Sequence, residues 1–510
     1  MVLASTNEGA RTGWPWQVLL LLSLPLIYFF YNIIYNLFFH PLRKFPGPLL
    51  NRISKIPYSL MLVRGNPSYE IKAMHDKYGS IVRTAPSELA FSDPKAWQDI
   101  MGHRKSSQAE NGKEMRYIQR VFDSSDILFS DREDHRRFRR ILSHGFSNQA
   151  LMGQQSLIMT YVEKLVSRLQ DKVSEGEMPV DVTAWYNFTT FDIIADLTFG
   201  EAFGLLDGGD YHPWVATIFA SIKAGTLMQI PNFYPALAWA IRKMMPKSLL
   251  EKRETHKRFT ADRVDKRLLS GVKRPDYMET ILTQREKETG GMSRGEIHAN
   301  ANTLIIAGSE TTATVLSATT YLCLTNPHVL EKVKEEVRSS FSSNSEIDLH
   351  SVVKLDYMLA MFEEAMRVYP PVPTNSGRRT PKGGDTICGQ FVPEDTTLCI
   401  WQLALYKDEK YFKNPDKFAP ERWLDDPEYK DDVRDIFQPF HFGPRSCLGR
   451  NLAYAEMRVI FAKILYDFEL ELMPESAKWI DHKMYTLWEK PKLMVKFTPA
   501  KGRECVATLA

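Results

Sequence analysis

The residue with the most distinctive chemistry is Cys447, which lies in the segment FHFGPRSCLG from Phe440 to Gly449 with no other cysteine nearby. A lone thiolate can hold one axial position of a haem iron, and this ligand pushes electron density toward cleavage of an O–O bond. A helix beginning just after the cysteine, as the apolar positions beyond Gly449 indicate, would stabilise the thiolate through its unpaired N–H groups. Gly443 would let the backbone approach a flat cofactor, and Arg445 offers paired donors for a carboxylate.

Two other roles for this cysteine remain open on the residues alone. A free cysteine inside a cytosolic protein is most often a small buried apolar side chain. Zinc is disfavoured because no second cysteine is close and His441 lies outside the usual ligand spacing.

Three further motifs precede this segment in the chain. Ala307 to Thr312 reads AGSETT; Glu364 and Arg367 lie three positions apart; and Pro420 to Trp423 reads PERW. With the segment around Cys447 they resemble, in order and spacing, the four signatures of the cytochrome P-450 haem-thiolate family. Phe440, Gly443 and Gly449 occupy expected positions of the haem-binding signature.

The resemblance implies an oxygen-activating role for the stretch around Thr311. Thr311 would donate a hydrogen bond to bound oxygen, Glu310 would relay protons from solvent, and Gly308 would allow a local opening of a helix over Asn300 to Thr320. The ordinary structural alternative is a threonine bonded back to a helix carbonyl beside a solvated glutamate.

The charged pair is interpreted as structural. Glu364 and Arg367 share one helical face, where an exposed pair contributes little to stability. If Arg422 of the PERW segment also reaches them, the three form a buried network that is costly to break.

Haem propionates need basic partners besides Arg445. By resemblance, His135 and Arg139 match the family's propionate-binding pair, although many members have tryptophan at the position of His135. The alternative for this basic run is a solvated helical face. Arg378 matches a further propionate ligand, and Arg379 would take that role if the register shifts by one.

Composition is consistent with one large catalytic domain. The chain has 510 residues, a net charge of +3, 44% hydrophobic residues and no linker or repeat that divides it, and nothing indicates nucleic-acid binding. The five scattered cysteines do not indicate a disulfide framework. The expected fold is mainly α with small β-sheets, the P-450 fold, including a short hairpin over Ile81 to Ser92.

The N-terminal region predicts a membrane anchor. Trp14 to Phe39 carries no charged residue and as a helix would exceed the roughly 30 Å hydrocarbon core. The predicted organisation is a short lumenal segment 1–13, a single transmembrane helix 14–39, a proline-rich hinge 40–55, a haem-thiolate domain 56–500 and a tail 501–510. Basic residues after the span place the domain in the cytosol, at the endoplasmic reticulum. Peripheral insertion is the alternative.

No part of the chain resembles a flavin or nicotinamide domain. By resemblance, electrons for haem b (iron protoporphyrin IX) and O2 come from NADPH through a separate cytochrome P-450 reductase, in some members with cytochrome b5. Arg136, Arg137 and Arg140 are candidate contacts for such an acidic partner.

The expected substrate is a lipophilic small molecule, since the segments expected to line the pocket carry no fixed charge clearly aimed inward. These segments are part of Gly102 to Ile127, Val215 to Trp239, Ala301 to Ala307, Val372 to Ser376, and Met484 to Leu487. Local segments of the chain, including PLRKFPGP and FDIIADLTFGEAFG, resemble those of fungal microsomal members that oxidise terpenoid, polyketide or alkaloid skeletons. A monooxygenase is favoured over a haem-thiolate isomerase or dehydratase, which needs no reductase, and over a noncatalytic haem sensor.

Overall fold

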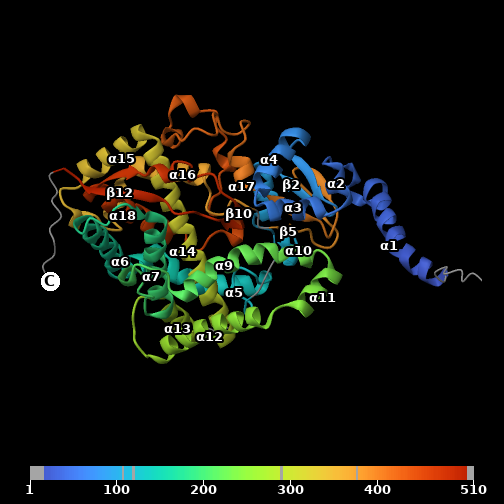
Figure 1. Cartoon of the computed structure of the whole chain (residues 1–510), viewed down its shortest axis with the longest axis horizontal. Coiled ribbons are helices and arrows are strands. Elements are labelled where there is room, and N and C mark those ends of the chain that lie inside the picture. The colour runs from blue at the N-terminus through green and yellow to red at the C-terminus, as the bar shows by residue number, and fades with distance from the viewer. Residues whose placement is uncertain (1–15, 106–107, 118–120, 288–290, 375–376, 502–510) are drawn as a thin grey trace, which may run out of the picture.

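The computed structural model describes residues 16–105, 108–117, 121–287, 291–374 and 377–501. The predicted 1–13 segment, most of the 501–510 tail, and parts of two expected pocket segments, 102–127 and 372–376, lie outside these residues. Figure 1 shows the described chain as a helical body with small sheets, from which α1 (Trp16–Ile34) extends on one side.

Helices form most of the body, as the composition and motifs predicted. The remaining α-helices are α2 (Leu49–Ile53), α3 (Ile56–Arg64), α4 (Pro67–Tyr78), α5 (Arg132–Ser143), α6 (Asn148–Ser174), α7 (Val182–Phe199), α8 (Leu205–Gly208), α9 (Pro213–Leu227), α10 (Gln229–Asn232), α11 (Pro235–Met244), α12 (Lys247–Leu269), α13 (Tyr277–Lys287), α14 (Arg294–Thr325), α15 (Pro327–Ser340), α16 (Asp356–Val368), α17 (Gln402–Tyr406) and α18 (Arg450–Asp467).

The strands form four small sheets. Their bounds are β1 (Ile81–Ala85), β2 (Glu88–Phe91), β3 (Gly112–Lys113), β4 (Val180–Asp181), β5 (Arg378–Arg379), β6 (Asp385–Ile387), β7 (Gln390–Val392), β8 (Thr397–Ile400), β9 (Phe468–Leu472), β10 (Met484–Tyr485), β11 (Leu487–Trp488) and β12 (Met494–Pro499). The largest sheet has the order β1-β2-β8-β5-β3, and β4-β12-β9, β10-β11 and β6-β7 form the others. The hairpin expected over Ile81 to Ser92 is confirmed as the antiparallel pair β1 and β2.

The long helix α14 crosses the core, packed against α7 and α18 (Figure 1). It begins with a capping box, in which Ser293 and Glu296 each satisfy the other's backbone N–H. Most of its hydroxyl groups bond to carbonyls one turn back, for example Ser317 to Ala313 at 2.7 Å, although Thr319 Oγ1 is buried without a partner. Because most of these polar groups are satisfied within the helix, α14 can be buried along most of its length.

Gly308 serves helix packing. The helix α14 is continuous through Gly308 and shows no opening there, contrary to the expectation from the sequence. A methyl group built on Gly308 would lie 2.8 Å from Ile194 Cδ1 of α7. The glycine is therefore needed for the close approach of two core helices.

The described N-terminal region begins with α1, which ends at Ile34. Within the described residues, no helix is long and apolar enough to cross a membrane. The last turn of the expected span, Tyr35–Phe39, belongs instead to the body of the protein, since Asn36 is buried and donates to Ile53 O at 3.1 Å. The expected hinge also packs on the domain, where Arg83 N donates to Pro46 O at 2.7 Å.

Candidate active site

Cys447 lies on the turn before α18, as the motif predicted. Gly449 is the residue before the helix, and its N–H donates to the Cys447 side chain. Cys447 N in turn donates to Phe440 O at 2.7 Å, which closes the loop around the thiol.

Cys447 differs from the other described thiols in its surroundings. It is exposed, whereas Cys323 and Cys399 are buried. Burial by surrounding protein nevertheless raises the pKa of the Cys447 thiol, although the Gly449 amide, Arg139 and Arg450 pull it down. A side chain that is accessible to solvent and yet surrounded by protein atoms is typical of the wall of an internal cavity. The helix start alone therefore does not ionise this thiol, whereas a coordinating metal ion would.

Gly443 also lies close to another segment of the chain. Its φ is +75°, and a Cβ there would lie 2.0 Å from Met101 O at the end of the helical turn η3 (Trp97–Met101). The backbone that comes close is thus another segment of the chain, and the glycine fixes how that segment meets the Cys447 loop.

Basic side chains gather beside this loop. Lys113, His135, Arg139, Arg378 and Arg445, here called the basic cluster, come from β3, α5, β5 and the Cys447 loop. Lys113 and Arg378 are directly opposite on the paired strands β3 and β5, an arrangement that like charges normally destabilise. A small cleft touches Arg378 and Arg445.

The charges of the basic cluster are poorly balanced. Burial and then Arg445 lower the pKa of Arg378 to about 9, and burial, Arg378 and Arg445 hold the pKa of Lys113 well below its ordinary value. Burial followed by Arg445 and Arg139 lowers the pKa of His135 to about 3. Glu110 binds Arg445 at 2.9 Å, while Arg378 Nη1 is buried without a hydrogen-bond partner. The site therefore fits an anion with more than one carboxylate.

The individual members contribute differently. Arg445 also donates to Ser130 O at 3.0 Å. Arg139 donates to Ser446 O at 2.6 Å, which places its guanidinium beside the cysteine. Arg378 is buried, whereas Arg379 is partly exposed and bound to Asp395 at 3.0 Å. Burial and the orphan donor favour Arg378 over its neighbour.

Thr311 and Glu310 lie on α14. Thr311 Oγ1 donates to Ala307 O at 2.7 Å, the ordinary structural alternative for this hydroxyl. Ala307 is exposed and Thr311 partly exposed although the positions around them are buried, so this face of α14 also borders open space. Glu310 is buried rather than solvated, and Lys490 binds its Oε1.

The expected pocket segments meet through hydroxyl groups. Thr226 Oγ1 of α9 and Thr486 Oγ1 are 2.8 Å apart, and Thr374 Oγ1 donates to Thr486 O at 3.2 Å. Thr486 joins β10 to β11 with a φ of 65°, which is unfavourable for a β-branched residue. A fourth expected pocket segment contacts α14, because Ile127 N donates to Asn300 Oδ1 of that helix at 2.9 Å.

Glu364, Arg367 and Arg422 form the buried network that the sequence suggested, with side chains that are 0% exposed. Arg367 Nη2 lies 2.7 Å from Glu364 Oε1, and Arg422 Nε lies 3.3 Å from Glu364 Oε2. Arg422 also binds Asp432, a member that the sequence did not reveal. Burial alone would raise the pKa of Glu364, but Arg367 and Arg422 outweigh it and hold the pKa below its ordinary value.

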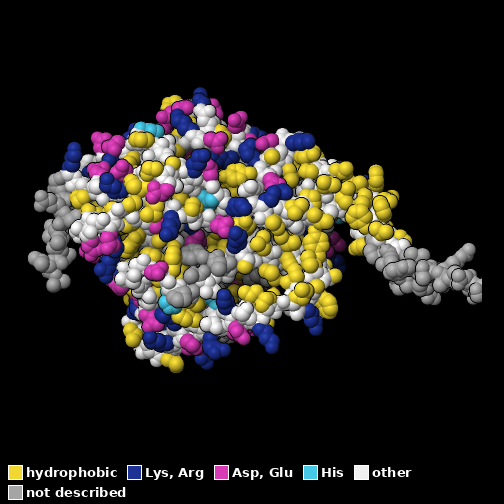
Figure 2. Space-filling view, in the orientation of Figure 1, with side chains coloured by type: hydrophobic (Ala, Val, Ile, Leu, Met, Phe, Trp, Pro, Cys, Tyr) yellow, Lys and Arg dark blue, Asp and Glu magenta, His cyan; other side chains and the backbone are white. Residues whose placement is uncertain are grey.

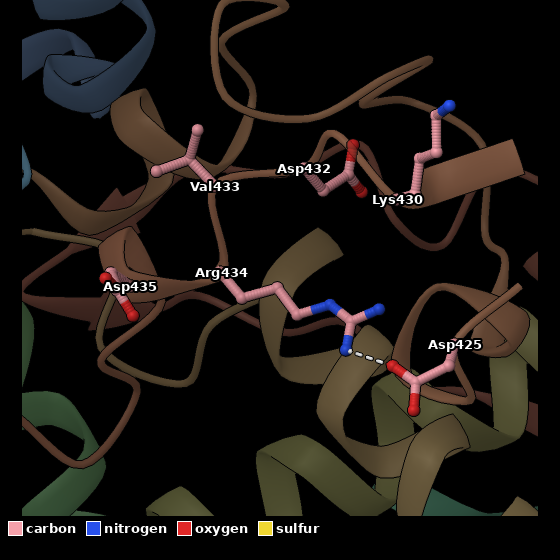
Figure 3. A pocket seen from close by; sticks show the side chains of 6 residues that line it. All are labelled: Asp425, Lys430, Asp432, Val433, Arg434 and Asp435. Carbon is pink, nitrogen blue, oxygen red and sulfur yellow. Dashed lines mark hydrogen bonds and ion pairs between the residues drawn. The ribbon is translucent and has the colours of Figure 1, made fainter. Parts of the chain in front are cut away.

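We call these four residues the acid–arginine network. Its remaining hydrogen-bonding groups are also paired: Ala419 N and Trp423 Nε1 each donate to Glu364 at 3.0 Å. Figure 3 shows a cleft that includes Asp432 of this network. It is lined by Asp425, Lys430, Asp432, Val433, Arg434 and Asp435. Arg434 binds Asp425 at 3.0 Å there, and no predicted catalytic or haem-binding residue lines that cleft.

The comparisons with known proteins decide the family. The family model described as cytochrome P-450 matches residues 47–497. This chain belongs to the cytochrome P-450 family. It is 42% identical to the cytochrome P-450 monooxygenase astA of Talaromyces wortmannii, over 95% of this chain and 98% of that protein.

Other relatives carry names of specific reactions. The trichothecene C-15 hydroxylase of Fusarium sporotrichioides is 43% identical over 93% of this P-450 and 96% of its own length. The averantin hydroxylase of Dothistroma septosporum is 42% identical over 92% of this chain and 89% of its own length. The protein is accordingly a P-450 monooxygenase, with relatives in fungal secondary metabolism.

Sequence reasoning missed two basic residues of this site. Lys113 lies outside every recognised motif, within a segment considered only as a pocket wall. Lys490 is separated from Glu310 by 180 positions. Neither lysine lies within a recognised motif, so no local pattern of residues marked it.

Proposed function

We propose that this P-450 inserts one oxygen atom of O2 into a lipophilic small molecule of fungal secondary metabolism, with electrons from an NADPH-dependent reductase. The observation that carries the proposal is the unbalanced basic cluster beside an exposed lone thiol. The names of the relatives support oxygenation over isomerisation or haem sensing. Hydroxylation, epoxidation and related oxidations of terpenoid, polyketide or alkaloid skeletons all fit this class.

The residues of the site suit haem b. Cys447 would be the axial ligand, and the basic cluster would hold the two propionates. When bound, haem would supply the redox chemistry that reduces O2 and leaves one oxygen atom for the substrate. Thr311 would turn its hydroxyl from Ala307 O toward the open space and donate there, while Glu310 would resupply the proton.

The substrate would lie between α14 and the segments that meet at Thr486. Exposed Ala307 and the Thr486 junction border this space, and the partners of Thr226 and Thr374 are hydroxyl or carbonyl groups rather than charges. A lipophilic molecule with few polar groups suits such walls.

A reductase would dock near α5. Arg136 and Arg140 are exposed on that helix. Arg137, the third candidate from the sequence, is partly exposed and bound to Glu296 and Asp134 at 2.6 Å each. We expect electron transfer to fall steeply with salt, and salt-independent transfer would exclude this docking mode. Cytochrome b5 is a second candidate donor.

The apolar surface supports attachment to the endoplasmic reticulum membrane, with the domain in the cytosol. Figure 2 shows hydrophobic side chains gathered over α2, α3 and α11 and continuing onto α1. Trp239 is 62% exposed and Met244 80% exposed, which is unusual for a soluble surface. Carbonate washing and protease protection of microsomes will distinguish a spanning segment 14–39 from a helix lying in the interface; release by carbonate would exclude the anchor.

The first experiment is the CO difference spectrum of the reduced protein in microsomes, compared with Cys447→Ser. A Soret band near about 450 nm that the variant lacks would establish the thiolate ligand. Haem-loaded protein without this band would overturn the assignment. NADPH consumption then separates a monooxygenase from an isomerase, which turns over without reductase.

Thr311→Ala tests the proposed proton donor. We expect more hydrogen peroxide released per NADPH consumed than in the parent enzyme, because the proton is no longer delivered at the right place. Thr312→Ala, on the buried side of the same helix, is the matched control. An unchanged peroxide ratio in Thr311→Ala would remove Thr311 from this role.

A further inference from the structure

Glu310 and Lys490 form a buried ion pair that is only partly satisfied. The Lys490 side chain is 3% exposed and that of Glu310 is 5% exposed. Lys490 Nζ binds Glu310 Oε1 and also donates to Thr314 Oγ1 at 2.7 Å. Glu310 Oε2 is buried and has no hydrogen-bond partner. A buried carboxylate oxygen without a hydrogen-bond partner lowers the stability of the fold, and such groups are typical of a functional site.

The position of Lys490 is rigidly defined. Trp488, two residues before it at the end of β11, donates to Pro370 O at 2.7 Å. The Trp488 ring stacks on Tyr369 with ring centroids 4.1 Å apart. The β10–β11 hairpin therefore places the ammonium group of Lys490 beside α14. The same hairpin contributes Met484 to Leu487 to the expected pocket.

The electrostatic surroundings of Glu310 leave Lys490 as its controlling partner. Burial raises the pKa of Glu310 above its ordinary value, and the opposing charge and hydrogen bond of Lys490 offset only part of that rise. The other ionisable groups near this pair are the hydroxyls of Tyr211 and Tyr369, whose own pKa values the Glu310 charge raises, and the ring of His482, whose pKa Lys490 lowers. No second cation among the described residues acts on Glu310.

We propose that Lys490 is a positioning residue that governs proton delivery through Glu310, an inference that rests on the oxygenase function proposed above. Lys490 favours the charged form of Glu310 and occupies its Oε1 while also bonding Thr314, which leaves Oε2 as the oxygen that exchanges protons. A proton taken up at Oε2 passes to the Thr311 oxygen as Thr311 gives its own hydroxyl proton to the O2 that is being reduced, and Lys490 keeps all of its protons throughout.

Infrared spectroscopy tests the charge of Glu310 without substrate, reductase or turnover. We expect Lys490→Met to show a stronger protonated carboxyl band at neutral pH than the parent, and Lys490→Met/Glu310→Gln to lose that gain. Glu456, whose buried carboxyl has a pKa raised to about 8, should contribute a constant band to every variant. Lys492→Met, an exposed lysine on the same segment, is the matched control and should match the parent.

Turnover tests the consequence for proton delivery. In the reconstituted enzyme without substrate, full reduction of O2 to water needs more protons than release as peroxide. We therefore measure peroxide released per NADPH as a function of pH. Lys490→Met should shift the midpoint of this profile upward by about 1 to 3 pH units, the effect of removing a close opposite charge, and Lys490→Arg should restore it.

A double-variant comparison guards against a folding defect in Lys490→Met. If Lys490 acts only through Glu310, Lys490→Met/Glu310→Gln should release the same peroxide per NADPH as Glu310→Gln alone. A clear further change in the double variant would overturn the proposal, as would Lys490→Met with no stronger carboxyl band and an unshifted profile. Failure of the parent to consume NADPH would overturn the oxygenase function instead, and the infrared result would still stand.

Discussion

The acid–arginine network and the basic cluster are both buried groups of charge, but only the first is balanced. In the network, Glu364 and Asp432 lie against Arg367 and Arg422, and backbone groups such as Tyr406 O and Pro415 O take further donors of Arg367. In the basic cluster, Glu110 is the acid bound directly to a member among the described residues, and Arg378 keeps an orphan donor.

This difference separates a structural role from a ligand-binding role. A satisfied buried network holds segments together and needs nothing from outside. A buried excess of positive charge persists only if the rest of the fold holds it in place, and it is relieved when an anion binds. Both regions contain buried arginines, so the balance of partners carries the distinction.

The largest effect is expected from breaking the balanced network. Glu364→Gln leaves two buried guanidinium groups facing a neutral side chain, and we expect a loss of about 3 to 5 kcal/mol in the free energy of unfolding. Urea denaturation of the haem-free and haem-loaded protein will measure it. A loss below about 1 kcal/mol in both forms would show that the network is not structural.

Removing a charge from the basic cluster should change the stability of the protein little and its haem affinity strongly. Arg378→Met removes one of several mutually repelling charges, so the stability of the haem-free protein should change by less than about 1 kcal/mol. Haem affinity should fall by about tenfold or more, as expected for the loss of a charge-assisted hydrogen bond. Haem titration followed in the Soret region measures this; unchanged affinity would exclude Arg378 as a propionate ligand.

The cluster also predicts a pH dependence. Burial and neighbouring cations, among them Arg445 for His135 and Arg378 for His441, lower the pKa of each histidine to about 3. Since an unfolded histidine titrates near 6.5, the unfolded chain binds more protons below that pH. Stability is therefore full above about pH 6.5 and falls as the pH drops toward 3, by at most about 1.4 kcal/mol per pH unit for each histidine.

Urea midpoints between pH 7 and pH 5 will test this slope. Haem should flatten it, because propionates next to His135 raise the pKa of its ring. His135→Gln should flatten it in the haem-free protein as well. A slope that is the same with and without haem would show that the cluster does not face the propionates.

The smallest effect is expected at Arg379, the matched control for Arg378. It is partly exposed, and its partner Asp395 is 77% exposed, so Arg379→Met should cost less than about 1 kcal/mol and leave haem affinity unchanged. The same haem titration measures both variants. A larger loss of haem at Arg379 than at Arg378 would reverse the assignment of the two residues.

Local motifs predicted much of this arrangement. The turn before α18, the helix α14, the β1–β2 hairpin and the approach of Arg422 to Glu364 all follow from residue types at short spacing or within known signatures. Long-range partners did not follow. Nothing near Glu310 in the sequence indicates a lysine from the β10–β11 hairpin, and nothing near Gly443 indicates that Met101 O would approach it.

The features that the sequence did not reveal share a physical cause. Gly308 and Gly443 were correctly singled out as glycines with a purpose, but that purpose depends on which distant segment packs there. Likewise, the polar residues Asn32 and Asn36 were noted within the apolar N-terminal run, yet the contact of Asn36 with Ile53 O decides where that run leaves the body of the protein.

The Thr486 junction has a consequence for how such enzymes diversify. Its backbone conformation would suit glycine or asparagine better than threonine, so selection for stability alone would favour replacing it. Only a hydroxyl group, however, keeps the link to Thr226. Drift at this one codon would therefore loosen the tie between α9 and the β10–β11 hairpin, while the bond from Thr374 to the backbone of residue 486 and the thiol with its basic cluster stay intact, which offers a lineage a short mutational route to new substrates.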